Sequence, residues 1–320
     1  MIRFTNDTHD FFENHNEEIV LWGAGNAGYF VGNYMDRCGM NGFCYVDENR
    51  IHDGVVCNGK RVYKPNELLK VGKKYRIVIT PYIYQPILDQ IAEYDWRVKG
   101  LDLLCLLPKF KSIEYDAERY NINKLLSYFR NKLITAPIPT FISNNCIAGH
   151  IYDLTDSLLQ SPTINTGFGA DAYLKFCENY RHYMDCTPEG IHMFRFADQN
   201  NGTIREEFAA YLDDIEVCFG HNYKAEDIVE RWELLSKRCD KENIVFILSD
   251  YHFYLTPDIR KRFATLPKKH YTIYSRCGVI DPSIDAENSI YLNHYIFDWH
   301  DRAIENVFDL VGWINSMGER

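Results

Sequence analysis

Three glycines in the segment IVLWGAGNAGYFVGNYM have the G-x-G-x-x-G spacing that can cradle a phosphate group. Gly23 permits a tight turn, Gly25 lets a phosphate approach the backbone, and Gly28 allows close packing of a helix on a strand. The N–H groups at the start of that helix would face the anion, with Asn26 as a further contact. Asp47 follows about 20 residues later, where a carboxylate accepts ribose hydroxyls. We therefore predict a nucleotide site, unless the glycines only form the turn or the site is degenerate and serves as a scaffold.

A second group of polar residues follows apolar segments in the C-terminal half. In an open α/β sheet, ligands bind outside the carboxyl ends of the strands. If the strands are parallel and adjacent, their polar ends converge on one cleft. The residues concerned are Ser143, Asn144, Asn145 and Cys146 after PTFI, His221, Asn222 and Tyr223 after IEVCFG, Ser249, Asp250, Tyr251 and His252 after NIVFIL, and Asn293 and His294 after SIYL.

These side chains suggest acid–base chemistry on a hydroxyl group. Asp250 and His221 are candidate catalytic bases, although His221 and His252 could equally be satisfied histidines of the core or rim. The amides of Asn144 and Asn145 could bind a hydroxyl-rich ligand or cap the next helix. The carboxylates that a metal would need beside Asp250 are not evident, so no metal is expected.

Cys146 is the third catalytic candidate. A position near a helix N-terminus lowers the pKa of a thiol, and His150 lies one turn along. The pair could form a nucleophile, but a buried unreactive thiol is the alternative. The predicted substrate-binding residues are Ser143, Asn144, Asn145, His150, Tyr223, Arg238 and His252.

Apolar strand patterns and helical patterns alternate in both halves of the chain, which predicts the α/β class with two α/β/α domains. The N-terminal sheet should be Rossmann-like and parallel, and the C-terminal sheet mostly parallel. We place the first domain at 1–110, a connecting helix at 111–136 and the second domain at 137–320. The segment TIREEFAAYL is expected to be a helix or an arm.

Composition narrows the function classes. A net charge of −10 disfavours a nucleic-acid-binding protein. The polar N-terminus is not a secretory signal, and no segment approaches the roughly 18 apolar residues of a membrane span, so a cytoplasmic location is expected. Ten cysteines without a C-x-x-C pair predict reduced thiols. Homo-oligomerisation stays open.

The first half resembles a known class of domain. VLWGAGNAG, FCYVDEN, NGKRVYKPNELL and YRIVIT follow one another as in the Rossmann-like N-terminal domains of bacterial sugar-modifying and polysaccharide-assembly enzymes. The resemblance covers about 90 residues. It implies that the glycine loop and the acidic strand end contact a nucleotide or nucleotide-sugar.

The second half resembles a bacterial domain found in products of exopolysaccharide and capsule gene clusters. ISNNCIAGHIY, SPTINTGF, YLKFCENYRHYM, FGHNYKAEDIVERWELLSKR and NIVFILSD carry the resemblance, between Phe141 and His294. Members of that group usually have an arginine three residues after the tryptophan. This chain has Leu235 there and keeps Arg238. The resemblance implies a pathway and a set of residues, and no mechanism.

Three functions are compatible with these patterns. The first is a nucleotide-sugar-dependent enzyme of surface-polysaccharide biosynthesis, most simply a transferase acting on a sugar. The second is a sugar oxidoreductase that uses NAD or NADP, against which stands the lack of a Y-x-x-x-K pair where short-chain sugar dehydrogenases need one. The third is a non-catalytic ligand-binding or assembly protein. The cofactor is unknown, with a nucleotide or nucleotide-sugar suspected.

Overall fold

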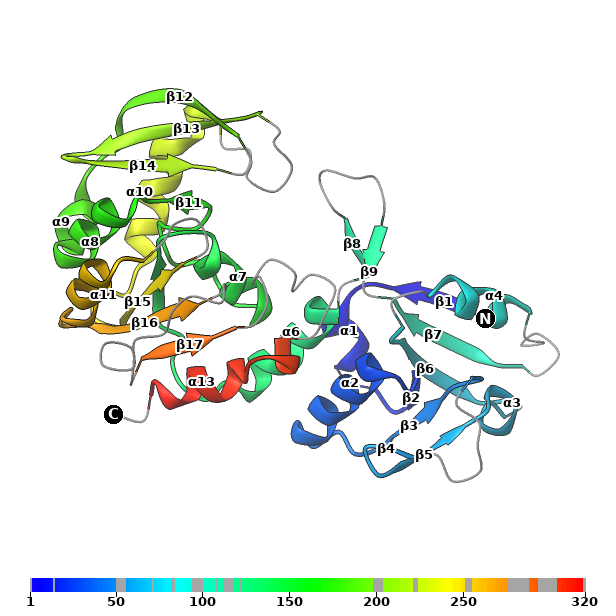
Figure 1. Ribbon diagram of the computed structural model, residues 1–320. Helices are drawn as coiled ribbons and strands as arrows, with labels where there is room; N and C mark the ends of the chain where they lie inside the picture. Colours follow the sequence, from blue (N-terminus) through cyan, green and yellow to red (C-terminus); the bar gives the residue numbers. More distant parts are fainter. Residues whose placement is uncertain are drawn as a thin grey trace. The chain divides into compact units, whose positions relative to one another are not determined.

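The computed structural model describes the chain except residues 1, 14, 50–55, 71, 82–83, 94–99, 108, 112–117, 121, 198–203, 221–223, 251–254, 275–287, 293–303 and 319–320. The chain forms two compact units (Figure 1). Unit 1 contains Met1–Ala136, Leu154–Asp156 and Phe297–Arg320, and unit 2 contains Pro137–Asp153 and Ser157–Ile296.

Unit 1 is built on a seven-stranded sheet with the order β1-β7-β6-β2-β3-β5-β4. All neighbouring strands are parallel except the β4–β5 pair. The strand order reverses between β2 and β6, which is where ligands bind in open α/β sheets. The strands are β1 (Ile2–Thr5), β2 (Glu18–Trp22), β3 (Phe43–Val46), β4 (Val56–Cys57), β5 (Lys60–Tyr63), β6 (Lys74–Ile79) and β7 (Asp102–Leu106).

Each face of this sheet carries an apolar core. Successive side chains of a strand point to opposite faces, so Ile19 and Leu21 of β2 pack in one core with Phe129, while Val20 packs in the other with Ile87. Unit 1 is therefore an α/β structure, as predicted. Its helices are α1 (Thr8–Phe12), α2 (Asn26–Arg37), α3 (Pro65–Leu68), α4 (Gln85–Glu93), α6 (Ile122–Leu133), the 3₁₀ helix η3 (Ile304–Asn306) and α13 (Leu310–Ser316).

The segment predicted as one connecting helix has a different structure. Of its described residues, only Ile122–Leu133 (α6) are helical, and two short antiparallel strands precede them, β8 (Lys109–Lys111) and β9 (Glu118–Tyr120). Leu125 and Leu126 of α6 join the core of unit 1. The helix is thus part of unit 1 and does not stand apart as a linker.

Unit 2 contains two four-stranded sheets. The first has the order β10-β15-β16-β17 and is entirely parallel, which confirms the predicted parallel arrangement for these strands. The second has the order β11-β14-β13-β12 and is antiparallel. The strands are β10 (Thr140–Ser143), β11 (Thr166–Gly167), β12 (Glu189–Ala197), β13 (Ile204–Leu212), β14 (Ile215–Phe219), β15 (Ile244–Ser249), β16 (Lys269–Tyr274) and β17 (Ser289–Tyr291).

Helices and a single large core join the two sheets of unit 2. Phe246 of the parallel sheet, Val217 of the antiparallel sheet and Trp232 of α10 belong to the same apolar cluster. The helix expected from ADAYLKFCENYRHYM is interrupted at Asn179, whose backbone leaves the helical region at φ −132° and ψ 42°. The helices are α7 (Ile147–Leu154), α8 (Ala170–Glu178), α9 (Tyr180–Asp185), the 3₁₀ helix η1 (Ala225–Asp227), α10 (Ile228–Arg238) and α11 (Pro257–Ala264).

The expectation of a helix or arm for TIREEFAAYL was wrong. These residues form β13, which pairs with β12 on one side and β14 on the other. Ala209, Ala210 and Leu212 are buried within this sheet. The tertiary pairing with two strands therefore outweighs the helix propensity of the Glu-Glu-Phe-Ala-Ala stretch.

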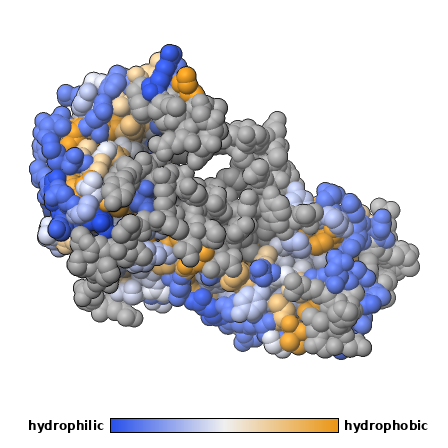
Figure 2. Space-filling view, in the orientation of Figure 1, coloured by the Kyte–Doolittle hydropathy of each residue, from blue (hydrophilic) through white to orange (hydrophobic). Residues whose placement is uncertain are grey.

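Where the surface is coloured in Figure 2, hydrophilic areas predominate, with smaller hydrophobic areas among them. Ile204 is the most exposed of the large apolar residues described, at 73%. Among the helices that the structure describes, none combines the length and apolar character needed to cross a bilayer. The nine cysteines in the described ranges are all free thiols, in agreement with the prediction of reduced cysteines.

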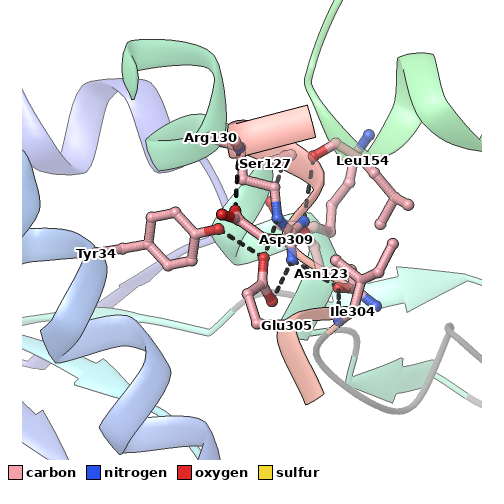
Figure 3. A network of polar contacts seen from close by, with 10 residues as sticks. Tyr34, Asn123, Ser127, Arg130, Leu154, Ile304, Glu305 and Asp309 are labelled. Carbon is pink, nitrogen blue, oxygen red and sulfur yellow. Dashed lines mark hydrogen bonds and ion pairs between the residues drawn. The ribbon is translucent and has the colours of Figure 1, made fainter. Parts of the chain in front are cut away.

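A buried ion pair holds the C-terminal segment in unit 1 (Figure 3). Arg130 of α6 is fully buried, and its Nε and Nη2 donate to the two carboxylate oxygens of Glu305 at 2.7 and 3.0 Å. Asn123 O, Asn123 Oδ1 and Leu154 O accept the other three guanidinium N–H bonds. The Tyr34 hydroxyl donates to Glu305 at 2.6 Å. Every donor of Arg130 therefore has an acceptor.

The unit boundaries follow from such contacts. Besides the ion pair, Asn315 of α13 donates to Leu133 O and accepts from Thr135 N. The segment from 297 onward thus belongs to unit 1, whereas the prediction had put 137–320 in the second domain. Segments far apart in the sequence therefore complete unit 1, whereas the prediction had made each domain one continuous stretch of the chain.

Candidate functional site

The carboxyl ends of β10 and β15 lie side by side because these strands are parallel neighbours. The side chain of Asn144, directly after β10, extends their pairing. Its Oδ1 accepts from Ser249 N at 2.8 Å and its Nδ2 donates to Ser249 O at 3.0 Å. The side-chain amide therefore pairs with Ser249 as a backbone peptide group of a neighbouring strand would. Asn144 thus fixes the ends of both strands through these two hydrogen bonds.

Ser143 and Asn145 hold the start of α7. Ser143 Oγ accepts from Ala148 N at 3.1 Å, and Asn145 Oδ1 accepts from Ile147 N at 3.1 Å. Both side chains are buried and satisfy helix N–H groups that have no acceptor within the helix. Asn145 therefore caps the helix, which was the alternative to binding a ligand.

Two buried polar atoms near these strand ends have no hydrogen-bond partner in the described part of the chain. They are Asn145 Nδ2 and Thr166 Oγ1, in residues only 1% and 2% exposed. The segments are close, because Phe168 N donates to Asn144 O at 3.1 Å. Buried polar atoms usually have a partner, so unpaired ones next to polar strand ends point to a ligand that supplies it.

Glu207 of β13 is a site residue that the sequence did not reveal. A Cβ built on Gly220 would lie 3.1 Å from Glu207 Oε2, so this carboxylate lies against the strand end that precedes His221. Its negative charge also raises the pKa of the Cys146 thiol. The segment had been interpreted as a helix or an arm. Only its antiparallel pairing as β13 brings the carboxylate beside the ends of β10 and β14.

The expected lowering of the Cys146 pKa was wrong. Burial, together with the smaller effect of the negative charge of Glu207, raises the pKa of this thiol to about 12. A thiol in this state is protonated at neutral pH and is a poor nucleophile. His150, one turn further along α7, is half-buried, and its N–H donates to Cys146 O at 3.2 Å. The structure therefore gives no activated cysteine here.

Asp250 takes the expected position at the carboxyl end of β15. It is 8% exposed, and its N–H donates to Ile273 O of the neighbouring strand β16 at 3.2 Å. With Glu207 it places a second carboxylate among the strand ends. Carboxylates and the Asn145 amide suit a neutral ligand with hydroxyl groups, whereas a phosphate would be repelled.

Arg238 does not lie with these residues. It is exposed in the last turn of α10, and the following Asp240 donates from its N–H to Thr140 Oγ1 at the start of β10. A helix that leads into a parallel strand ends at the amino edge of the sheet, opposite the strand ends. His221, Tyr223 and His252 lie outside the described residues, as do Asn222, Tyr251, Asn293 and His294.

In unit 1 the glycine loop joins β2 to α2, at the point where the strand order reverses. Gly23 has φ +114°, a value that side chains with a Cβ rarely adopt. A Cβ on Gly28 would lie 2.0 Å from Gly23 O, so the first turn of α2 packs directly on the loop backbone. The roles predicted for these two glycines in the turn and in close packing agree with this geometry.

Substitution of Gly28 by alanine should destabilise unit 1. The added methyl group meets backbone atoms that cannot move without displacing α2, so we expect a loss of about 2 kcal/mol in the free energy of unfolding. Urea denaturation of Gly28→Ala and of Gly42→Ala would measure it. A Cβ on Gly42 meets nothing within 4 Å, and Gly42 has no positive φ that alanine would strain. Equal stability of Gly28→Ala and the unchanged protein would contradict the packing argument.

Gly25 differs from its neighbours because space is open beyond it. A Cβ built there meets nothing within 4 Å, and the residue is the N-cap of α2 without a side-chain capping bond. The first N–H groups of a helix, here from Asn26 onward, have no acceptor within the helix. An anion could approach these groups across Gly25, and the positive end of the helix dipole would favour it.

Asp47 directly follows β3, and its carboxylate is hydrogen-bonded to the glycine loop. Its Oδ2 accepts from Ala24 N and its Oδ1 accepts from Asn49 N, both at 2.9 Å. Each oxygen keeps a second lone pair for a hydroxyl. The carboxylate thus lies beside the glycine loop, but it also has a structural role that the sequence did not indicate.

Comparison with known proteins places most of the chain in a family. Residues 116–315, more than half of the chain, match the family described as Domain of unknown function (DUF1919). The chain belongs to the DUF1919 family. A Haemophilus influenzae (strain ATCC 51907 / DSM 11121 / KW20 / Rd) protein that carries the name Uncharacterized protein is 23% identical over 214 residues, which cover 65% of this chain and 97% of that relative.

The DUF1919 match contains one of the two candidate sites and does not reach the other. It includes β10, β15 and Glu207, together with Arg130 and Glu305 of the buried ion pair. It begins after the glycine loop and Asp47. The strand-end site therefore lies in the DUF1919 region, whereas the glycine loop belongs to the part of the chain before it. Within the described residues, no group of three or more His, Cys, Asp or Glu could hold a metal ion.

Proposed function

We propose that this protein is a nucleotide-sugar-dependent enzyme of surface-polysaccharide biosynthesis, most simply a transferase acting on a sugar. The observation that carries the proposal is the open space beyond Gly25, over the uncapped start of α2 at the reversal of the strand order. N–H groups at a helix start bind phosphate, which every nucleotide-sugar contains. The resemblances described for both halves of the sequence point to the same pathway.

The strand-end site of unit 2 has the complementary chemistry. The Asn145 Nδ2, which has no partner in the described part of the chain, can donate hydrogen bonds, and Glu207 and Asp250 can accept them. Sugar hydroxyls both donate and accept, so this set suits a sugar better than a phosphate. Asp250 would deprotonate an acceptor hydroxyl bound at these strand ends.

Replacement of Gly25 by alanine should weaken nucleotide-sugar binding at least tenfold. Gly25 has φ −79° and ψ −167°, which alanine can adopt, so the fold should stay intact. The methyl group would fill the space through which a phosphate reaches the helix start. Titration calorimetry with UDP-, GDP- and CDP-sugars, on both proteins, measures the change.

The same titrations distinguish the alternatives. A panel with NAD and NADP tests the oxidoreductase, for which Asp47 beside the loop would bind the ribose hydroxyls. Gly42→Ala is the matched control, because a Cβ there also meets nothing within 4 Å and Gly42 has no positive φ. If no nucleotide-sugar produces heat, or if Gly25→Ala binds as tightly as the unchanged protein, the proposal is wrong.

A further inference from the structure

A groove of about 510 Å³ lies in unit 2, apart from the strand-end site. It is formed by the last residues of α9 and α10 and the segments that follow them. Cys186 and Cys239, the C-caps of these helices, both line it. Trp232 Nε1 donates to Cys186 O at 3.1 Å and so ties the two helix ends together. The groove is therefore a fixed feature of the fold.

The groove contains a buried hydroxyl group without a partner. Ser236 of α10 lines the groove and is 6% exposed, and its Oγ makes no hydrogen bond in the described part of the chain. A serine on a helix can bond to the carbonyl one turn back, which makes an unpaired buried hydroxyl unusual. This oxygen can accept one hydrogen bond and donate another to a molecule in the groove.

The charges of the groove favour a cation. Asp185, Glu233 and Asp240 supply three carboxylates, of which Asp185 pairs with Lys241 at 2.5 Å and Glu233 with Lys237 at 3.6 Å, so one carboxylate is in excess. The C-terminal carbonyl groups of two helices add further negative potential. A metal ion is not indicated, because no described group of three or more His, Cys, Asp or Glu could hold one. An organic cation fits better.

We propose that this groove binds a small molecule that carries a primary ammonium group next to hydroxyl groups. The ammonium would donate to a carboxylate of the rim and to Ser236 Oγ. Neighbouring hydroxyls would pair with the Lys237 and Lys241 ammonium groups and with the Thr187 hydroxyl. This site is separate from the glycine loop, which lies in the other unit, and does not depend on the function proposed above.

Calorimetric titration with glucosamine, glucose and 1,4-diaminobutane tests the proposal, because the first two differ only in the ammonium group. Glucosamine should bind at least fivefold more tightly than either of the others. Ser236→Ala should weaken glucosamine binding about tenfold, since a hydrogen bond to a charged group is lost. Ser236 Oγ has no partner in the described chain, so this variant should fold normally.

Two further variants complete the test. Glu233→Gln removes one negative charge of the groove and should weaken glucosamine binding severalfold. This variant tests the proposal even if Ser236→Ala does not fold. Gly25→Ala and Glu206→Gln, a substitution on β13, should leave glucosamine binding unchanged. Equal binding of glucose and glucosamine, no binding of any probe, or unchanged affinity in both groove variants would overturn the proposal.

Discussion

Replacement of Arg130 by methionine is expected to lower the free energy of unfolding by about 3–5 kcal/mol, because a buried charge loses its partner. Methionine retains most of the apolar volume, but among the described residues Glu305 then keeps only the Tyr34 hydroxyl as a side-chain donor to its negative charge. Leu154 O and both oxygens of Asn123 also lose a donor. Urea denaturation measures the loss, and hydrogen exchange shows whether it is located in unit 1.

The matched control is the double variant Arg130→Met with Glu305→Gln. The amide removes the charge and can still accept from Tyr34, so the double variant should be more stable than Arg130→Met alone. If the double variant were the less stable one, the buried charge would not be the cause of the loss.

The pH dependence gives a second measurement of the same ion pair. Burial works to raise the pKa of Glu305, but the charge and hydrogen bonds of Arg130 outweigh it and leave the pKa below its usual value. A carboxylate with a lowered pKa in the folded state stabilises the protein above its unfolded pKa of about 4.3, and this contribution is lost as the pH falls through the folded pKa. Arg130→Met should lose this acid dependence.

Replacement of Asp250 by asparagine should lower kcat for sugar transfer by about 10²- to 10⁴-fold, the usual contribution of a catalytic base. Asparagine has the same shape and cannot take a proton. Asp250 is not part of the glycine loop, so the affinity for the nucleotide-sugar should not change. The measurement is release of free nucleotide from whichever nucleotide-sugar binds, with titration calorimetry for the affinity.

Asp171→Asn is the control for this prediction. Asp171 is also a carboxylate of unit 2, but its side chain is 84% exposed in the first turn of α8, where it pairs with Arg262. Its replacement should leave kcat unchanged. If Asp250→Asn retains full activity, Asp250 is not the base. If the unchanged protein binds a nucleotide-sugar but releases no nucleotide with any acceptor, a non-catalytic binding protein is the better interpretation.

Local sequence patterns predicted the α/β class and much of the site. Runs of apolar residues gave the buried strands β2, β10 and β15, and the glycine spacing predicted the turn at Gly23 and the packing at Gly28. The polar residues after β10 and β15 do lie at one edge of a parallel sheet. These features depend on neighbours in the sequence and on the general rule that parallel strands share their carboxyl edge.

Features that depend on pairing between distant segments could not be predicted. Glu207 reaches the site only because β13 pairs with β14, and Arg130 meets Glu305 across 175 positions of the sequence. The thiol of Cys146 was expected to respond to the helix start, but burial and Glu207 determine its pKa. Arg238 was predicted to bind the substrate from the resemblance of the second half to other proteins. However, α10 ends at the amino edge of the parallel sheet and places Arg238 there.

The interrupted course of unit 1 along the chain has a consequence for synthesis on the ribosome. Unit 2 is nested between Ala136 and Phe297, and Glu305, the counterion of Arg130, comes after it. Domains generally begin to fold as they emerge, the earlier ones first. Here Met1–Ala136, which is most of unit 1, is synthesised first, and Arg130 lacks its counterion until the whole of unit 2 has been made. The domain that starts first is therefore the one that matures last.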